Sequence, residues 1–146
     1  MKNLSIPFLL ISIATVSYAE PVYLKCIYPV SEKTGLAGET RSVNITIDES
    51  NGQVTYTHFN GEVNIYIGFF SANEVKFQDI TSDYIGHAKI TTSQSWIINR
   101  QDLSIQKTNT MEFEDTDKFE PDDAMTTIKS VNEGKCEIIT VKDRKF

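Results

Sequence analysis

The chain has 146 residues, and its 20 Asp and Glu outnumber its 14 Lys and Arg, which gives a net charge of −6 at pH 7. Proteins that bind nucleic acid neutralise phosphates with clustered Lys and Arg, so this composition argues against a nucleic-acid partner. The length fits one domain with its own hydrophobic core.

The first nineteen residues have the three parts of a secretory signal peptide. Lys2 supplies the positive charge, residues 6–16 form an apolar run, and Ala19 is the small residue that a signal peptidase reads. The apolar run is shorter than the roughly 20 residues that span a bilayer. The sequence therefore predicts cleavage after Ala19 and a single β domain over residues 20–146. We expect this domain to be periplasmic or secreted, without membrane insertion.

The mature chain begins with a predicted strand, Pro21–Tyr28, which contains the first of two cysteines. Cys26 and Cys136 would lie in a compartment that oxidises thiols, so we predict that they form a disulfide. This bond would close a loop of about 110 residues and stabilise the fold by at most about 4.7 kcal/mol in the chain-entropy model, because strain in the native state reduces the gain. It would either place the first and last strands side by side or connect two sheets. Two free buried thiols are the alternative.

The middle of the chain, from Ser42 to Gly68, has the pattern of a three-stranded antiparallel meander. Val43, Ile45 and Ile47 alternate with polar residues, as a half-buried strand requires. Asn-Gly pairs supply the positive φ angles of hairpin turns. The pattern predicts strands over Ser42–Asp48, Gln53–Phe59 and Glu62–Gly68, with turns at Asn51-Gly52 and Asn60-Gly61.

The second half of the chain continues with short apolar segments and turn residues. Strands are predicted over Glu74–Ile80, Tyr84–Thr92, Ser95–Arg100, Leu103–Thr108, Ala124–Val131 and Lys135–Val141. Turns are predicted at Thr81–Asp83, Ser93-Gln94, Gln101-Asp102 and Asn132–Gly134, and a loop at Met111–Asp123. This spacing indicates an all-β fold of about 9–10 strands. We expect a single antiparallel meander that forms a small barrel or a two-sheet sandwich with one disulfide.

Short motifs along the mature chain resemble a class of small uncharacterised exported proteins of Gram-negative bacteria. The motifs are a cysteine shortly after the signal, Ile47-Asp48 with Asn51-Gly52, Trp96 with Ile98-Asn99-Arg100, and the closing Gly134-Lys135-Cys136. In that class the late hairpin often reads I-D-R-x-T-G, and this chain has Leu103 at the position of the glycine. The resemblance implies export and carries no activity.

The most distinctive chemical feature is the acidic segment between Met111 and Asp123. Its carboxylates are ligands of the kind that Ca²⁺ prefers, but the segment lacks the Asp-x-Asp-x-Asn-Gly turn of a calcium-binding loop. A solvated loop, contact with a basic protein partner and cation binding are the three interpretations. The candidate contact residues are Glu112, Glu114, Asp115, Asp117, Glu120, Asp122 and Asp123.

Aromatic residues in the predicted strands belong either to the core or to the lining of a ligand cavity inside a barrel. The candidate cavity residues are Tyr56, Tyr66, Phe77, Tyr84 and Trp96. His58 and His87 are the only histidines, and with both cysteines in a disulfide they are too few for a structural zinc site. We therefore expect no metal and no cofactor.

The sequence contains none of the common hydrolase motifs. It has no Gly-x-Ser-x-Gly, no His-Glu-x-x-His and no phosphate-binding glycine loop. We assign no catalytic residue, and the first hypothesis is an exported, non-enzymatic protein that binds another protein through its loops or its acidic segment. A carrier of a small apolar ligand in the barrel interior is the alternative, and a hydrolytic enzyme is the third. The oligomeric state is not predicted.

Overall fold

The computed structural model describes residues 20–29, 40–115 and 125–140. These residues form one all-antiparallel sheet, in the order β4-β3-β2-β1-β9-β8-β7-β6-β5. Its strands are β1 Val22–Pro29, β2 Thr40–Asp48, β3 Gln53–Thr57, β4 Val63–Ile67, β5 Phe69–Phe70, β6 Glu74–Ile85, β7 Ala88–Asn99, β8 Ser104–Asp115 and β9 Met125–Ile138. The all-β meander is confirmed, and of the two expected architectures it is the barrel-like one, with the sheet nearly closed on itself.

The predicted disulfide is confirmed and joins neighbouring strands. In the antiparallel pairing of β1 with β9, Cys26 lies directly opposite Cys136, with 3.9 Å between the two Cα atoms. The bond therefore places the first and last described strands side by side. The described residues contain no helix that is long and apolar enough to cross a membrane. Both findings are compatible with an exported protein.

The predicted meander is confirmed as β2, β3 and β4. Gly52 and Gly61 have φ angles of +67° and +87°, the left-handed conformation that the Asn-Gly pairs were expected to supply. The Asp48 carboxylate fixes the first turn, because it accepts hydrogen bonds from the Ser50 hydroxyl at 2.7 Å and from the backbone nitrogen of Asn51 at 3.1 Å. These side-chain hydrogen bonds lower the pKa of Asp48.

Two turns predicted in the next part of the chain are wrong, because β6 and β7 are each one long strand. Thr81–Asp83 lies inside β6 and Ser93-Gln94 inside β7. The hairpin instead turns at Gly86, which has a φ of +62°. The Ser and Thr residues of these segments suggested turns, but in the structure they lie within the paired strands β6 and β7. The hydroxyls of Ser82 and Thr91, which lie opposite one another, are 3.1 Å apart.

The prediction for β8 and β9 is wrong in the same way. Met111–Asp115 was expected to belong to a loop and is the end of β8, and Asn132–Gly134 was expected to be a turn and lies inside β9. Gly134 allows β1 to approach β9 closely and does not reverse the chain. A Cβ atom there would collide with the Ile27 carbonyl oxygen and touch the Tyr28 ring, so β1 passes directly against β9 at this point.

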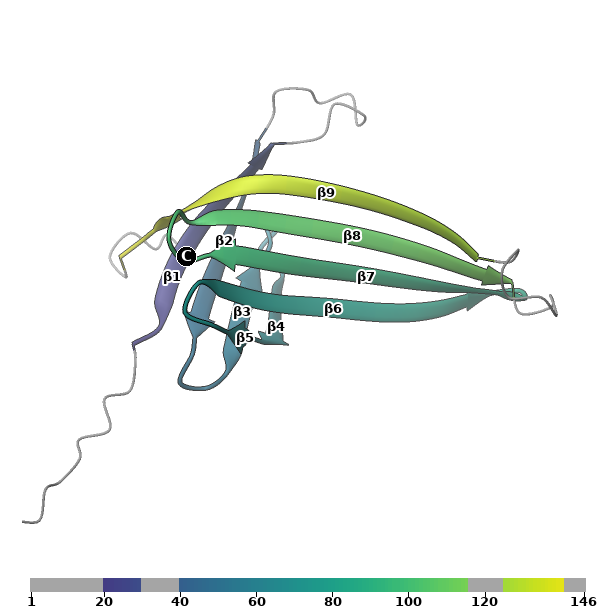
Figure 1. Ribbon diagram of the computed structural model, residues 1–146, viewed down its shortest axis with the longest axis horizontal. Coiled ribbons are helices and arrows are strands. Elements are labelled where there is room, and N and C mark those ends of the chain that lie inside the picture. The colour runs from purple at the N-terminus through teal and green to yellow at the C-terminus, as the bar shows by residue number, and fades with distance from the viewer. Residues whose placement is uncertain (1–19, 30–39, 116–124, 141–146) are drawn as a thin grey trace, which may run out of the picture.

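The buried side chains lie at one end of the sheet. They are Leu24, Cys26, Tyr28, Val43, Ile45, Ile47, Val54, Tyr56, Val75, Phe77, Trp96, Ile98, Ile105 and Cys136. In the hairpin of β6 and β7, no residue between Phe77 and Trp96 is buried. Figure 1 shows that β6–β9 extend far beyond the shorter strands β1–β5. We call residues 78–95, 108–115 and 125–131 the arm, and the remaining described residues the core end.

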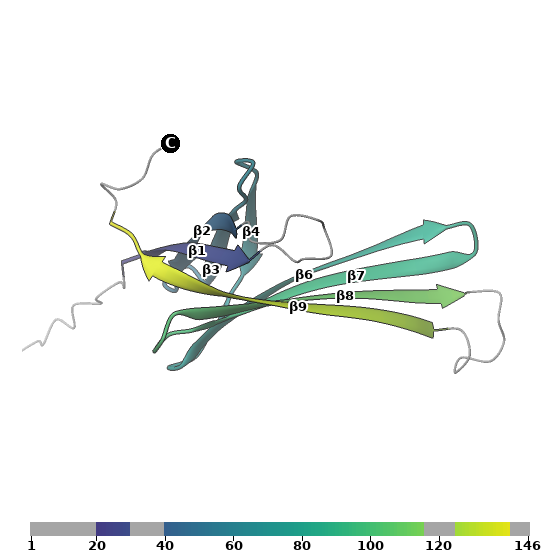
Figure 2. The same ribbon diagram turned by 90° about the horizontal axis from the view of Figure 1, so that it is seen from above.

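The arm has two faces, and neither is covered by another described strand (Figure 2). Side chains alternate along a strand, and residues paired across strands share a face. The face that carries Trp96 at the core end is called the inner face, and the opposite face is called the outer face. On it, Thr92 pairs with Met111 and Met111 with Ile128, while Ile90 pairs with Phe113.

Candidate functional site

The acidic residues predicted as contacts do not form one described cluster. Glu112 and Glu114 lie on the outer face of β8, where the Glu114 carboxylate is 3.8 Å from the Lys89 ammonium. Asp115 ends β8. Asp117, Glu120, Asp122 and Asp123 lie outside the described residues, as does the predicted signal peptide over residues 1–19. The described residues contain no group of three or more His, Cys, Asp or Glu placed to hold a metal ion.

Four of the five candidate cavity aromatics lie together at the core end. The rings of Phe77 and Trp96 stack with centroids 4.9 Å apart, Tyr66 stacks on Phe77 at 5.5 Å, and Tyr56 lies 5.3 Å from Trp96. Tyr56, Phe77 and Trp96 are buried, and burial raises the pKa of Tyr56 to about 12. Tyr84 is elsewhere, 68% exposed on the arm. The four rings thus fill space against one another.

Lys107 is a residue near these rings that the sequence did not single out. Its ammonium nitrogen lies 5.1 Å from the Trp96 ring centroid, a cation–π distance. Partial burial lowers the pKa of Lys107, because the charged form loses hydration. No sequence motif marks this lysine, since its position over Trp96 depends on the pairing of β7 with β8.

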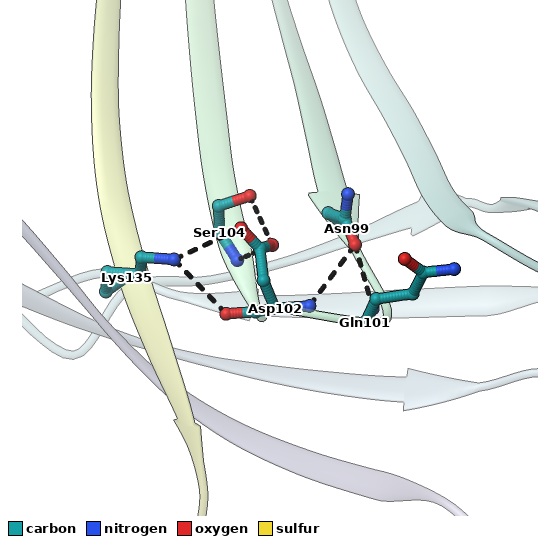
Figure 3. Close-up of polar contacts among 5 residues, drawn as sticks. All are labelled: Asn99, Gln101, Asp102, Ser104 and Lys135. Carbon is teal, nitrogen blue, oxygen red and sulfur yellow. Dashed lines mark hydrogen bonds and ion pairs between the residues drawn. The ribbon is translucent and has the colours of Figure 1, made fainter.

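The turn between β7 and β8 is the densest polar network in the part of the chain that the structure describes. The Asn99 side-chain oxygen accepts from the backbone nitrogens of Gln101 and Asp102, at 2.8 and 3.3 Å. The Asp102 carboxylate accepts from the Ser104 nitrogen at 2.9 Å and hydroxyl at 2.7 Å, and from the Lys135 ammonium at 3.2 Å (Figure 3). Hydrogen bonds from Ser104, followed by the interactions with Lys135, lower the pKa of Asp102 to about 2.

This network holds the backbone of the turn. Leu103 has a φ of +55°, which is uncommon for a residue with a side chain, and it stands where the resembling class has glycine. Its carbonyl accepts a hydrogen bond from the Cys136 nitrogen at 2.8 Å, so the turn is attached beside the disulfide. Asp102, Ser104 and Lys135 satisfy one another at a turn, and the contacts indicate a structural role.

An open groove of about 910 Å³ lies next to this turn. Its lining residues are Ile27, Pro29, Glu74, Ile97, Asn99, Ser104, Ile105, Gln106, Glu133, Gly134 and Lys135. The charged groups of the groove have partners: Glu74 pairs with Lys76 at 2.7 Å, Lys135 with Asp102, and Glu133 accepts from the Gln106 side chain at 3.3 Å. The serine that lines the groove, Ser104, donates its hydroxyl to the Asp102 carboxylate, whose pKa of about 2 makes it too weak a base to activate a nucleophile at neutral pH.

The inner face of the arm is one of the two surfaces that no other described strand packs against. Five apolar side chains gather on it, and we call them the inner-face cluster: Ile85, Ile90, Met111, Phe113 and Ile128. Ile85 is 69% exposed and Ile128 58% exposed. Sequence reasoning missed this cluster by assigning Met111–Asp123 to a loop. The alternation of Met111 and Phe113 with Glu112 and Glu114 is the strand signal that could have found it.

Comparisons with protein-family models, with curated proteins and with solved structures found no match to this chain. The resemblance to exported proteins of Gram-negative bacteria therefore stays an expectation from the sequence. The candidate functional site rests on the geometry of the arm.

Proposed function

We propose that this protein is an exported, non-enzymatic binding protein whose arm contacts another protein. The observation that supports this function is the length of β6–β9 beyond the core. Ordering each residue costs about 1–2 kcal/mol of conformational entropy, which burial of apolar surface normally offsets. The arm instead leaves apolar side chains exposed on both faces, and exposed apolar patches mark interaction sites. A protein partner would supply the missing burial.

The two other functions have less support. A carrier needs interior volume, whereas Tyr56, Phe77 and Trp96 are buried and pack ring against ring. An enzyme needs a nucleophile or an acid–base pair free to meet a substrate. The hydroxyl of Ser104 and the ammonium of Lys135 both donate to Asp102 within a turn. The arm therefore remains the surface best suited to a function.

Export is part of the proposal and has its own test. The predicted signal peptide and the disulfide both favour the periplasm or the cell exterior of a Gram-negative bacterium. Amino-terminal sequencing of the protein recovered from the native host is expected to begin at Glu20. A chain that retains residues 1–19 in the cytoplasmic fraction would contradict export.

Contact through the arm is tested by site-specific photo-crosslinking in the native host. A photoreactive amino acid replaces Thr92 on the inner face or Ser93 on the outer face, and Asn44 on β2 is the control at the core end. We expect one defined protein, identified by mass spectrometry, to be linked from at least one arm position and not from Asn44. Adducts that form equally from all three positions, or from none, would contradict the proposal.

A further inference from the structure

Resting on the proposed function, we propose that the inner face of the arm binds a cationic amphipathic segment of the partner protein. In this complex, apolar side chains of the segment cover the inner-face cluster, and Lys or Arg side chains lie against Asp79 and Asp83.

The apolar part of the surface is continuous across strands. Met111 on β8 lies directly opposite Ile128 on β9, and Phe113, two residues further along β8, lies opposite Ile90 on β7. Met111 is 38% exposed and Ile128 58%, while Ile90 and Phe113 are half-buried against their neighbours. A binding segment would thus meet an apolar surface that is already formed. The half-buried side chains of Ile90 and Phe113 would lose little conformational entropy when the segment covers them.

Within the arm, the described charged side chains of this face have one sign, whereas Lys107, on the same face at the core end, lies over the Trp96 ring. Asp79 and Asp83 both lie on the inner side of β6, since Asp83 pairs with Ile90 and Asp79 with Gln94. Neither carboxylate has a cationic partner among the described residues. The outer face differs, because there Lys89 pairs with Glu114 and Lys129 is also present. Electrostatic complementarity therefore favours a cationic ligand on the inner face alone.

The spacing of the two carboxylates adds a geometric requirement. They are four residues apart on one strand, which corresponds to about 13 Å. The row that contains Thr81, Met111 and Ile128 lies between them. Ile90 and Phe113 share the row of Asp83, and both carboxylates lie on β6, at one edge of the cluster. A matching segment therefore carries two basic side chains about 13 Å apart along one edge of its apolar surface.

The same charges disfavour other occupants of this face. A second copy laid face to face would bring the carboxylates of two chains together, and each chain has a net charge of −6. Anionic lipid surfaces and nucleic acid would meet the same repulsion. A cationic protein segment gains from both the apolar and the acidic residues.

The test uses a fluorescent 14-residue amphipathic peptide of Leu and Lys as the probe, and the disulfide-bonded mature chain as the receptor. Fluorescence anisotropy at low and at physiological salt is expected to show saturable binding. A double variant of the cluster, Met111→Ser with Ile128→Ser, is expected to weaken binding about tenfold, and Asp79→Asn with Asp83→Asn about fivefold with a smaller salt dependence.

The matched control removes two comparably exposed apolar side chains from the outer face, Ile80→Ser with Val131→Ser. It is expected to bind the peptide as the unmodified chain does. Equal weakening by the inner and outer variants, no binding, or equal binding of a peptide with Glu in place of Lys would overturn the inference. A partner crosslinked from Ser93 alone would also overturn it, while the proposed binding function would stand.

Discussion

The core end and the arm are built from the same strands but differ in what holds them. Within β7, Trp96 and Ile98 are buried, whereas Ile90 and Thr92, four to six residues earlier on the same face, are only half-buried. The antiparallel register of β6–β9 continues without a break through both regions. The pairing of β6–β9 therefore continues along their whole length, whereas side chains are buried only at the core end.

This difference separates stability from surface chemistry. Buried clusters determine the global free energy of unfolding, and regions with few buried contacts open at lower cost. Substitutions at the core end should change the stability of the whole fold. Substitutions on the arm should change what the surface binds and leave the fold in place.

The largest expected effect is that of Trp96→Ala at the core end. The substitution removes the ring that stacks on Phe77 and leaves a cavity, so we expect the free energy of unfolding to fall by about 3–5 kcal/mol. Trp96 is the sole tryptophan, and urea unfolding should therefore be followed by circular dichroism. A loss below about 1 kcal/mol would contradict a packed aromatic core at this position.

Reduction of the disulfide is expected to destabilise the protein by about 2–5 kcal/mol, because the unfolded chain regains the freedom of a long loop. The two cysteines are 110 residues apart in the sequence. Urea unfolding with and without dithiothreitol measures the effect, and a Cys26→Ala, Cys136→Ala variant serves as the control that the reductant should not change. Equal unfolding midpoints of the native chain in both conditions would argue against the bond.

Gly134→Ala should cost about 1–3 kcal/mol, because the added methyl group must displace neighbouring backbone. That methyl group would collide with the Ile27 carbonyl oxygen of β1. Ser130→Ala, four residues earlier on the inner face of β9, is the matched change on the arm and should be nearly neutral. Unfolding of both variants at the same urea concentration would contradict a close contact between β1 and β9 at Gly134.

Gly134 also illustrates what the sequence could not reveal. A glycine after Asn132 and Glu133 predicts a turn by composition, but here it makes room for another strand, and that need arises only from tertiary pairing. By contrast, Gly52 and Gly61 follow Asn residues between strands with clear alternation, and those local signals were sufficient for β2–β4. The cysteine pairing followed from the count of cysteines and the expected compartment.

The candidate surface was harder to predict than the fold. The turn assignments at Thr81–Asp83 and Ser93-Gln94 divided long strands into short ones, because Ser, Thr and Asp are frequent in turns. When β6 and β7 are treated as single long strands, the register places residues of β6, β7, β8 and β9 beside one another, although these residues are far apart in the sequence. The inner-face cluster is a product of that register and has no local motif.

Alkaline pH should test the burial of Tyr56. Its pKa in the folded protein is about 12, above the value near 10 expected in the unfolded chain. Between these values the unfolded chain loses the proton first, so stability falls as pH rises from about 10 to about 12 and is unaffected below this range. The difference in urea midpoint between Tyr56→Phe and the native chain should grow in favour of the variant from pH 9 to pH 11. A constant difference would indicate a solvated phenol.

The smallest expected effect is on the arm, where Thr92→Ala and Thr110→Ala should each change the free energy of unfolding by less than about 0.5 kcal/mol. Thr92 lies on the same strand and face as Trp96, so Thr92→Ala and Trp96→Ala compare a half-buried with a buried position of β7, with side chains that also differ in size. Amide hydrogen exchange supplies a second measurement, because amides of residues 79–94 should exchange faster than those of β1 and β2. Equal protection of all β7 amides from exchange would mean that the arm unfolds only together with the core end. This result would contradict the view that the core end determines stability and that the arm determines only what the surface binds.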